Sequence, residues 1–175
     1  MRPDVIVCAV GGTPRALPVP GAENALHALD TYREGFTAHG NVIVIGGGNH
    51  AAETGVYLSG IPGVEHVTVL RANLDGVGEG KAVNIIRREM DKRGMELVED
   101  ERLLRLEPGL VITDKGGRRA DLIVYHLSME PRTDTVEAIR AAAGDIPVVL
   151  VGDCKAPRVV ANAIREGFVA AMEIV

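Results

Sequence analysis

The residues best suited to chemistry are three consecutive glycines within the segment NVIVIGGGNHAAETG, residues 41–55. Gly46, Gly48 and Ala51 have the spacing GxGxxA. In a strand–turn–helix unit, the first glycine permits a tight turn and the second lets the backbone approach a diphosphate, while the small third residue allows close helix–strand packing. The N–H groups and positive dipole end of the following helix would face the phosphates.

The sequence around these glycines supplies the context that this fingerprint requires. Residues 41–46 predict a strand, 49–60 a helix and 65–71 a second strand. Together they form a βαβ unit of about 30 residues, the size expected when a helix connects parallel strands. We therefore predict a dinucleotide site that includes Gly46, Gly47, Gly48, Asn49, His50, Ala51 and Glu53. A glycine-rich turn that only makes a tight corner is the alternative.

The choice of dinucleotide depends on the end of the second predicted strand. Arg71 stands where an acidic residue would accept hydrogen bonds from the ribose 2′-hydroxyl of NAD. An arginine there can instead pair with the 2′-phosphate of NADP, although a single arginine at a strand end is often only solvated. The sequence favours NADP(H) and leaves both cofactors open.

Composition excludes several other kinds of function. The chain has 175 residues, 46% of them apolar, which suffices for one ordinary domain or two small ones. The net charge of −5 has no long basic run, so we expect no nucleic-acid partner. The apolar stretches are too short to cross a membrane, and the N-terminus lacks a convincing signal peptide, which predicts a cytoplasmic protein.

Metal and hydrolytic chemistry have no sequence support. Cys8 and Cys154 are the only cysteines and form no CxxC pair. The five histidines have no metal-ligand spacing, and no HExxH, GxSxG or P-loop string occurs. We predict neither a metal site nor a catalytic acid or base.

The remaining pattern predicts an α/β fold. Strands are expected at 4–10, 95–99, 102–107, 109–114, 120–127 and 146–153, and helices at 23–34, 78–94, 133–144 and 157–175. Thr133 is expected to cap its helix, and Pro157 to lie in the first turn of the last one. Bends at 108–109 and 116–117 predict an antiparallel ribbon as crossover in a Rossmann-like, three-layer domain.

Three segments, 4–21, 41–53 and 151–171, resemble a known family in their order and spacing. They are similar to flavoprotein pyridine nucleotide reductases, of the pyridine nucleotide-disulfide oxidoreductase type, which have two dinucleotide-binding domains. The closest resemblance is to the C-terminal region of NADH:flavin oxidoreductases related to 2,4-dienoyl-CoA reductase, enoate reductase and trimethylamine dehydrogenase. It covers nearly the whole chain.

The resemblance implies a domain organisation and a second cofactor, FAD. It assigns 1–36 and 129–175 to parts of an FAD-binding domain, and 37–128 to an inserted NAD(P)H-binding domain. Gly152 and Asp153 match the family's Gly-Asp motif, in which the aspartate holds a hydroxyl of FAD. Gly11 joins the candidate cofactor-binding residues, and Glu53 matches a position near the nicotinamide.

Several of these residues also have ordinary explanations. Asp153 could cap the following helix, Glu53 could form a surface charge pair, and His50 could face solvent. Cys154 is expected to be a small buried residue, because no histidine or second cysteine lies near it in sequence.

The chain also departs from the family pattern. The βαβ unit that binds the ADP part of FAD is missing, as are the FMN-binding barrel and the iron–sulfur cluster of the dienoyl-CoA reductase type. Ser128 and Met129 stand where the family has a glycine. The chain therefore resembles a fragment of a longer enzyme.

The expected function is the NAD(P)H-binding portion of a flavin-dependent oxidoreductase, which delivers hydride from NAD(P)H to a flavin. Two alternatives stay open: an isolated dinucleotide-binding module without turnover, and a subunit completed in trans by a flavin-binding partner. Unpaired strand edges at the termini also predict a homodimer.

Overall fold

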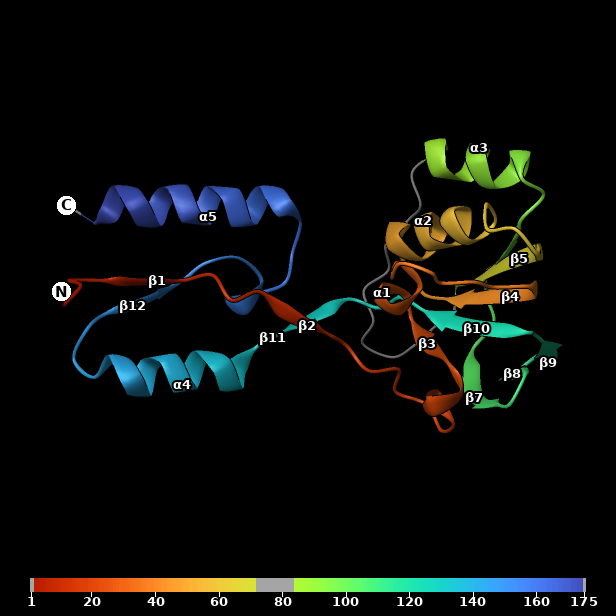
Figure 1. The fold of residues 1–175 in the computed structure, drawn as a ribbon, viewed down its shortest axis with the longest axis horizontal. Coiled ribbons are helices and arrows are strands. Elements are labelled where there is room, and N and C mark those ends of the chain that lie inside the picture. Colours follow the sequence, from red (N-terminus) through yellow and green to blue (C-terminus); the bar gives the residue numbers. More distant parts are fainter. Residues whose placement is uncertain (1, 72–83, 175) are drawn as a thin grey trace. The chain divides into compact units, whose positions relative to one another are not determined.

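The computed structural model describes residues 2–71 and 84–174, and the chain forms two compact units (Figure 1). The central unit comprises Ala16–Leu127, and the terminal unit combines Met1–Arg15 with Ser128–Val175. The central unit starts at residue 16, earlier than the boundary predicted at residue 37, because strand β3 (Leu26–His27) belongs to its sheet.

The central unit is built on a five-stranded parallel sheet. Its strands are β3, β10 (Leu122–Tyr125), β4 (Gly40–Ile45), β5 (Val64–Leu70) and β6 (Glu96–Val98), in that spatial order. Val44 lies in register with Val124 on one side and Val69 on the other. The predicted βαβ unit is confirmed, with helix α2 (Asn49–Leu58) between β4 and β5.

Successive side chains of β4 point to opposite faces of the sheet, so the core of this unit has two layers. Val42 and Val44 pack with the helix side, where α2 and α3 (Asn84–Lys92) lie. Ile43 and Ile45 point to the opposite face and pack with the ribbon side. Side chains of a strand alternate between faces, so a strand that is apolar throughout requires cover on both. The three-layer α/β fold predicted from the sequence is confirmed.

The second cover is an antiparallel ribbon of β7 (Leu103–Glu107), β8 (Leu110–Thr113) and β9 (Gly116–Arg119). The bend predicted at 116–117 is wrong, because both glycines belong to β9. The turn lies before them, where Thr113 Oγ1 accepts a hydrogen bond from the Lys115 N–H at 3.2 Å.

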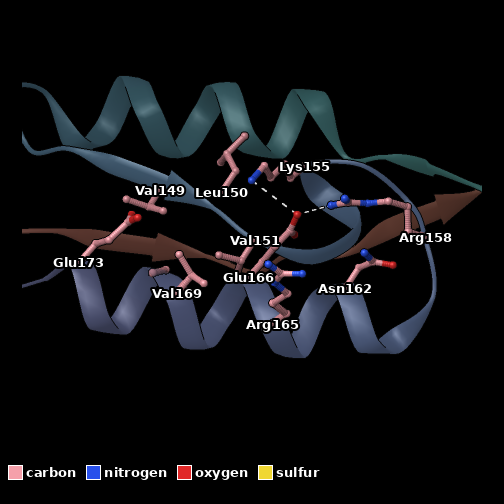
Figure 2. Close-up of a pocket in the computed structure, with 11 residues that line it drawn as sticks. Val149, Leu150, Val151, Lys155, Arg158, Asn162, Arg165, Glu166, Val169 and Glu173 are labelled. Carbon is pink, nitrogen blue, oxygen red and sulfur yellow. Dashed lines mark hydrogen bonds and ion pairs between the residues drawn. The ribbon is translucent and has the colours of Figure 1, made fainter.

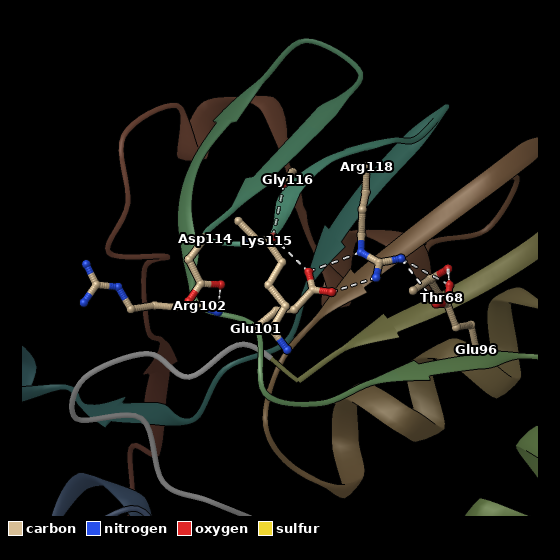
Figure 3. Close-up of polar contacts among 9 residues, drawn as sticks. Thr68, Glu96, Glu101, Arg102, Asp114, Lys115, Gly116 and Arg118 are labelled. Atoms are coloured by element: carbon tan, nitrogen blue, oxygen red, sulfur yellow. Dashed lines mark hydrogen bonds and ion pairs between the residues drawn. The ribbon is translucent and has the colours of Figure 1, made fainter.

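An ion pair connects the ribbon to the sheet (Figure 3). Glu101 is only 6% exposed and accepts hydrogen bonds from Arg118 at 2.7 Å and from Thr113 at 2.8 Å. The Arg118 guanidinium also reaches Glu96 on β6 at 3.3 Å, and its hydrogen bond to Glu101 holds the pKa of that carboxyl below its usual range. Only the Glu101 carboxylate is buried, since the Arg118 side chain is 31% exposed. Loss of Arg118 would leave this carboxylate without its main partner, so the pair fixes the ribbon's orientation.

The terminal unit has two separate two-stranded sheets. Strand β1 (Ile6–Cys8) pairs in parallel with β12 (Val148–Leu150), while β2 (Gly12–Pro14) pairs antiparallel with β11 (Met129–Pro131). Helices α4 (Thr133–Ala143) and α5 (Val160–Glu173) lie on opposite sides of the β1–β12 pair (Figure 1). Cys8, Val136 and Cys154 form its buried centre, and both cysteines are free thiols.

Two helix boundaries differ from the prediction. Thr133 is the first helical residue of α4 rather than its cap, and the capping position is Arg132, without a side-chain cap bond. Helix α5 begins at Val160, three residues after Pro157, because the short 3-10 helix η2 (Gly152–Cys154) and an extended stretch intervene.

Residues 23–34 do not form the single helix that was predicted. They contain the end of a 3-10 helix (η1, Ala22–Asn24), strand β3 and the short helix α1 (Ala28–Thr31). Pairing of β3 with β10 fixes the extended backbone at Leu26 and His27. The first part of the predicted helix 78–94 lies outside the described residues. No helix in the described part of the chain has the length and apolarity needed to cross a membrane.

Two glycines in loops of the central unit share a left-handed backbone conformation but differ in the space around them. Gly21 and Gly35 both have positive φ, 79° and 75°. A Cβ at Gly35 would meet nothing within 4 Å, whereas one at Gly21 would collide with the Leu106 carbonyl oxygen. We expect Gly35→Ala to destabilise by about 1–2 kcal/mol, the cost of a left-handed backbone. Gly21→Ala should cost about 1–3 kcal/mol more because backbone must move. Urea unfolding measures both, and equal losses would contradict the predicted packing of this loop.

Candidate functional site

The turn from β4 into α2 lies where three strands end together. The Gly46 N–H donates to the Leu70 carbonyl at the end of β5, at 3.0 Å. A Cβ at Gly46 would collide with the carbonyl oxygen of His126, just after β10, and would lie 2.7 Å from the Cβ of Ala51. Position 46 therefore requires glycine for packing.

Gly48 has a different environment. It is the N-cap of α2, with φ −114° and ψ −176°, a backbone conformation open to any residue. Among residues 2–71 and 84–174, a Cβ there would meet nothing within 4 Å, and no side chain makes a cap hydrogen bond to the helix. Open space thus lies against the backbone at the N-terminus of α2, where the helix dipole favours negative charge.

Helix α2 packs closely on the sheet through small residues. Ala51 is fully buried, and a Cβ at Gly55 would lie 2.8 Å from Met95 Cε and 2.9 Å from Val69 Cγ2. The predicted packing role of Ala51 is therefore present. Asn49 begins the helix beside Gly47 and Gly48, all three partly exposed.

His50 and Glu53 lie on the exposed side of the first turn of α2. Their side chains are 74% and 54% exposed and approach within 3.4 Å, from His50 Nδ1 to Glu53 Oε2. The two side chains therefore form an ordinary surface contact with each other. This contact lies at the N-terminal end of α2, the same end as Gly48.

A polar cluster that the sequence did not reveal lies behind this turn. Thr54 Oγ1 donates to the His50 carbonyl at 2.7 Å, and lies 2.9 Å from His126 Nδ1 and 3.1 Å from the Tyr32 hydroxyl. The His126 ring stacks on the His50 ring, with centroids 5.2 Å apart and planes 25° apart. These residues are far apart in sequence, so spacing alone could not bring them together.

Burial favours the neutral form of His126 and of the nearby His27. Burial lowers the pKa of His126 from its ordinary value of 6.5 to about 4, helped by the nearby His50 and His27. Burial also lowers the pKa of His27, whose Nδ1 accepts the Leu29 N–H at 3.2 Å. His27 Nε2 is buried without a hydrogen-bond partner among the described residues.

Arg71 has a carboxylate partner. It directly follows β5, and its Nη1 lies 2.9 Å from Glu99 Oε1, just after β6. Arg87 on α3 reaches the other oxygen of Glu99 at 3.1 Å. The hydrogen bond from Arg71 is the main cause that lowers the pKa of Glu99. Two guanidiniums thus converge on one carboxylate at the edge of the sheet.

Gly11, Gly152 and Asp153 belong to the terminal unit, whereas the residues at 46–53 and 71 belong to the central unit. Gly11 and Gly152 have φ of 73° and 69° and follow neighbouring strand ends, joined by a Val151 N–H bond to the Cys8 carbonyl at 3.0 Å. Asp153 is partly exposed in η2.

Glu166 on α5 holds the turn at Gly152, a role that the sequence did not indicate. Its Oε2 accepts the Gly152 N–H at 2.8 Å, and Arg158 and Lys155 pair with its other oxygen. This backbone hydrogen bond is the main cause that lowers the pKa of Glu166. The carboxylate lies in a groove of about 260 Å³ between α5 and β12 (Figure 2).

Cys154 is buried, as expected from the sequence, and its thiol donates to the carbonyls of Cys8 and Val151 at 3.1 and 3.2 Å. Burial raises the pKa of the Cys8 thiol. Both thiols therefore pack as small buried groups in the terminal unit.

The sequence from residue 1 to residue 167 matches the pyridine nucleotide-disulphide oxidoreductase family. The chain belongs to this family. Its members are oxidoreductases that use FAD and NAD(P)H. The comparison with curated protein sequences gave no significant match.

Solved structures share the fold. 6-Hydroxypseudooxynicotine amine oxidase from Pseudomonas geniculata N1 is 19% identical, with a TM-score of 0.79 over 99% of this chain and 29% of its own. A 2-naphthoyl-CoA reductase is 24% identical, with a TM-score of 0.73 over 95% and 26%. Thioredoxin reductase from Lactococcus lactis is 22% identical, with a TM-score of 0.72 over 97% and 64%. The chain thus spans between about a quarter and two thirds of these proteins.

The lowered pKa of His126 predicts a pH-dependent stability. Because its folded pKa is about 4 and its unfolded pKa about 6.5, the folded state binds fewer protons between these values. The free energy of unfolding should therefore have its full value above about pH 6.5. It should decrease by up to about 3 kcal/mol as the pH falls towards 4. His126→Phe should reduce this slope in urea unfolding, whereas His66→Gln at an exposed position should not. Equal slopes in wild type and His126→Phe would contradict the prediction.

Proposed function

We propose that this chain binds NAD(P)H at the N-terminus of α2 and that, in a longer flavoenzyme, this positions the nicotinamide for hydride transfer to a flavin. Membership of the family supports an oxidoreductase role for the whole protein. The single observation that supports this place for the nicotinamide nucleotide is the uncapped start of α2, with open space where Gly48 lacks a side chain.

The residues of this turn fit a diphosphate. Close approach of an anion needs an open helix N-terminus, and α2 begins after Gly48, which has no side chain. Gly47 and His50 flank the same backbone, and Glu53 lies within the first turn. Gly46 and Ala51 shape the turn by packing against each other and against the end of β10.

We further propose that both NADH and NADPH are ligands of this site. Arg71 has the right place to meet a 2′-phosphate, beyond the end of the second strand of the βαβ unit. Glu99 already accepts its hydrogen bond, so a phosphate there would have to compete with a carboxylate. Arg71 and Arg87 together carry two positive charges against the one negative charge of Glu99, which still favours an added anion.

The terminal unit would contribute to the flavin site. Gly11 and Gly152 make room at two neighbouring strand ends, and Asp153 offers a partly exposed carboxylate for a hydroxyl. When bound, FAD supplies the acceptor for hydride from the nicotinamide. The chain's own part is to bind and orient the cofactors, and no side chain of the site is required as acid or base.

A narrower relationship to the enoate reductase group is also part of the proposal. Two of the similar structures are named as a 2-naphthoyl-CoA reductase and an amine oxidase, which agrees with a group that contains CoA-ester reductases and amine dehydrogenases. Their identities of 24% and 19% support the fold only. The segments 4–21 and 151–171 are the sequence basis for this relationship.

The 175-residue chain by itself is proposed to bind the dinucleotide without turnover. In the terminal unit, β12 pairs only with β1 among the described residues, and the Gly152 N–H is bonded to Glu166. FAD would therefore lack a phosphate anchor there. A flavin-binding segment of a longer chain, a partner subunit or a second copy would complete this unit by pairing with its exposed strand edge.

The first test concerns Gly48. A side chain fits the backbone there, so Gly48→Val should change the free energy of unfolding by no more than about 1 kcal/mol. It should weaken NADH and NADPH binding by about tenfold or more, because it fills the space in front of the helix N-terminus. Calorimetric titration measures both ligands. Gly167→Ala in α5, also an open position, is the control that leaves the affinities unchanged. Wild-type affinity in Gly48→Val would remove the proposed site.

The second test concerns flavin. The purified chain of residues 1–175 should be colourless and should contain no bound FAD by visible absorbance, while it still binds NADH. Addition of FAD should leave its thermal midpoint unchanged, since a flavin held without its phosphates binds weakly. One flavin per chain in the purified protein would contradict the proposed lack of a phosphate anchor. Flavin that appears only with a co-purified second polypeptide would support completion in trans.

A further inference from the structure

The hydrogen bonds of Thr54 fix the protonation of the His126 ring. A threonine hydroxyl has one proton to donate and two lone pairs that accept. The His50 carbonyl can only accept, and it lies 2.7 Å from Thr54 Oγ1, so the single proton of Thr54 goes there. Thr54 must then accept from its other two neighbours, the Tyr32 hydroxyl at 3.1 Å and His126 Nδ1 at 2.9 Å.

His126 can donate to Thr54 only if its proton is on Nδ1. A neutral imidazole has one N–H and one lone pair, so Nε2 is left as an acceptor. The His126 ring is neutral because burial lowers its pKa, and burial lowers the pKa of His27 in the same way. His27 has the opposite tautomer, because its Nδ1 accepts the Leu29 N–H and its proton is therefore on Nε2.

His126 lies next to the proposed dinucleotide site. His126 follows β10 directly, its N–H donates to the Ile45 carbonyl at 2.9 Å, and its own carbonyl abuts Gly46. Its ring stacks on His50 in the first turn of α2. Among the described residues, no donor is bonded to His126 Nε2.

We propose that His126 is a positioning residue of the dinucleotide site, whose Nε2 accepts a hydrogen bond from a ribose hydroxyl next to the bound diphosphate. This inference rests on the proposed binding of NAD(P)H at α2. The ribose hydroxyls are the donors of a dinucleotide that lie closest to its diphosphate, and the His126 ring stacks on His50 in the helical turn proposed to bind that diphosphate. The Tyr32–Thr54 pair acts through His126, since it holds the tautomer that makes Nε2 an acceptor.

The first measurement is the tautomer itself. Nitrogen NMR of the wild-type chain, labelled at histidine, should show His126 protonated at Nδ1 and His27 protonated at Nε2 at neutral pH. Thr54→Val should shift His126 towards a mixture of tautomers, and Thr54→Ser should retain the wild-type state. Protonation of His126 at Nε2 in the wild-type chain would overturn the proposal, and this result requires no variant to fold.

The second measurement is ligand affinity. His126→Phe keeps the stacked ring without its nitrogens and should weaken ADP-ribose and NADH binding by about three- to tenfold, the loss of one hydrogen bond. His126→Gln places an amide oxygen at the position of Nε2 and should recover part of this loss. Inorganic pyrophosphate has no ribose, so its ability to compete with NADH should be equal in wild type and His126→Phe.

The outcomes separate this inference from the proposed function. If the wild-type chain binds neither NADH nor NADPH, the dinucleotide site itself is wrong. If it binds them and His126→Phe binds them equally well, the site stands and only the role of His126 is wrong. Equal losses of ADP-ribose and pyrophosphate in a folded His126→Phe would also overturn it, because they would show a general distortion of the turn.

Discussion

The central unit depends on the absence of one side chain, at Gly46. Three neighbouring strands end at this residue, with the Leu70 carbonyl bonded to its N–H and the His126 carbonyl against its Cα. A side chain there would push β4 away from β10 or lift α2 from the sheet. Because that contact is close, α2 starts directly beyond the strand ends, and its N-terminus faces the crevice where ligands of parallel α/β sheets bind. The packing of the sheet and the proposed site thus share one constraint.

The sequence predicted those parts of the central unit whose residue types follow a local pattern along the chain. Apolar residues throughout 42–45 required cover on both faces of the strand, and the glycine spacing after them predicted the turn and the helix. Local composition could not predict β3, since only two residues of it are extended and their conformation comes from pairing with β10. The failure at residues 23–34 is therefore a tertiary effect that overrides helical spacing.

The candidate site was predictable in its backbone but not in its polar side chains. Gly46, Gly48 and Ala51 follow a spacing set by helix and turn geometry. Thr54 and His126 are 72 residues apart, and the fold alone brings them within hydrogen-bond distance. Glu99 is 28 residues from Arg71 and joins it because β5 and β6 are neighbours. Charge partners across parallel strands have no fixed spacing, so the sequence could assign Arg71 only a choice of roles.

The two glycine turns of the chain differ in the one property that matters for phosphate. Both follow the carboxyl ends of parallel strands, Gly48 after β4 and Gly152 after β12. At Gly152 the backbone N–H already donates to the carboxylate of Glu166, so this donor is occupied and is not open to an anion. At Gly48 no side chain caps the helix, and the nearest carboxylate of the first turn, Glu53, points to its exposed side. The free start of α2, compared with the occupied N–H at Gly152, is therefore the reason to propose the diphosphate site in the central unit.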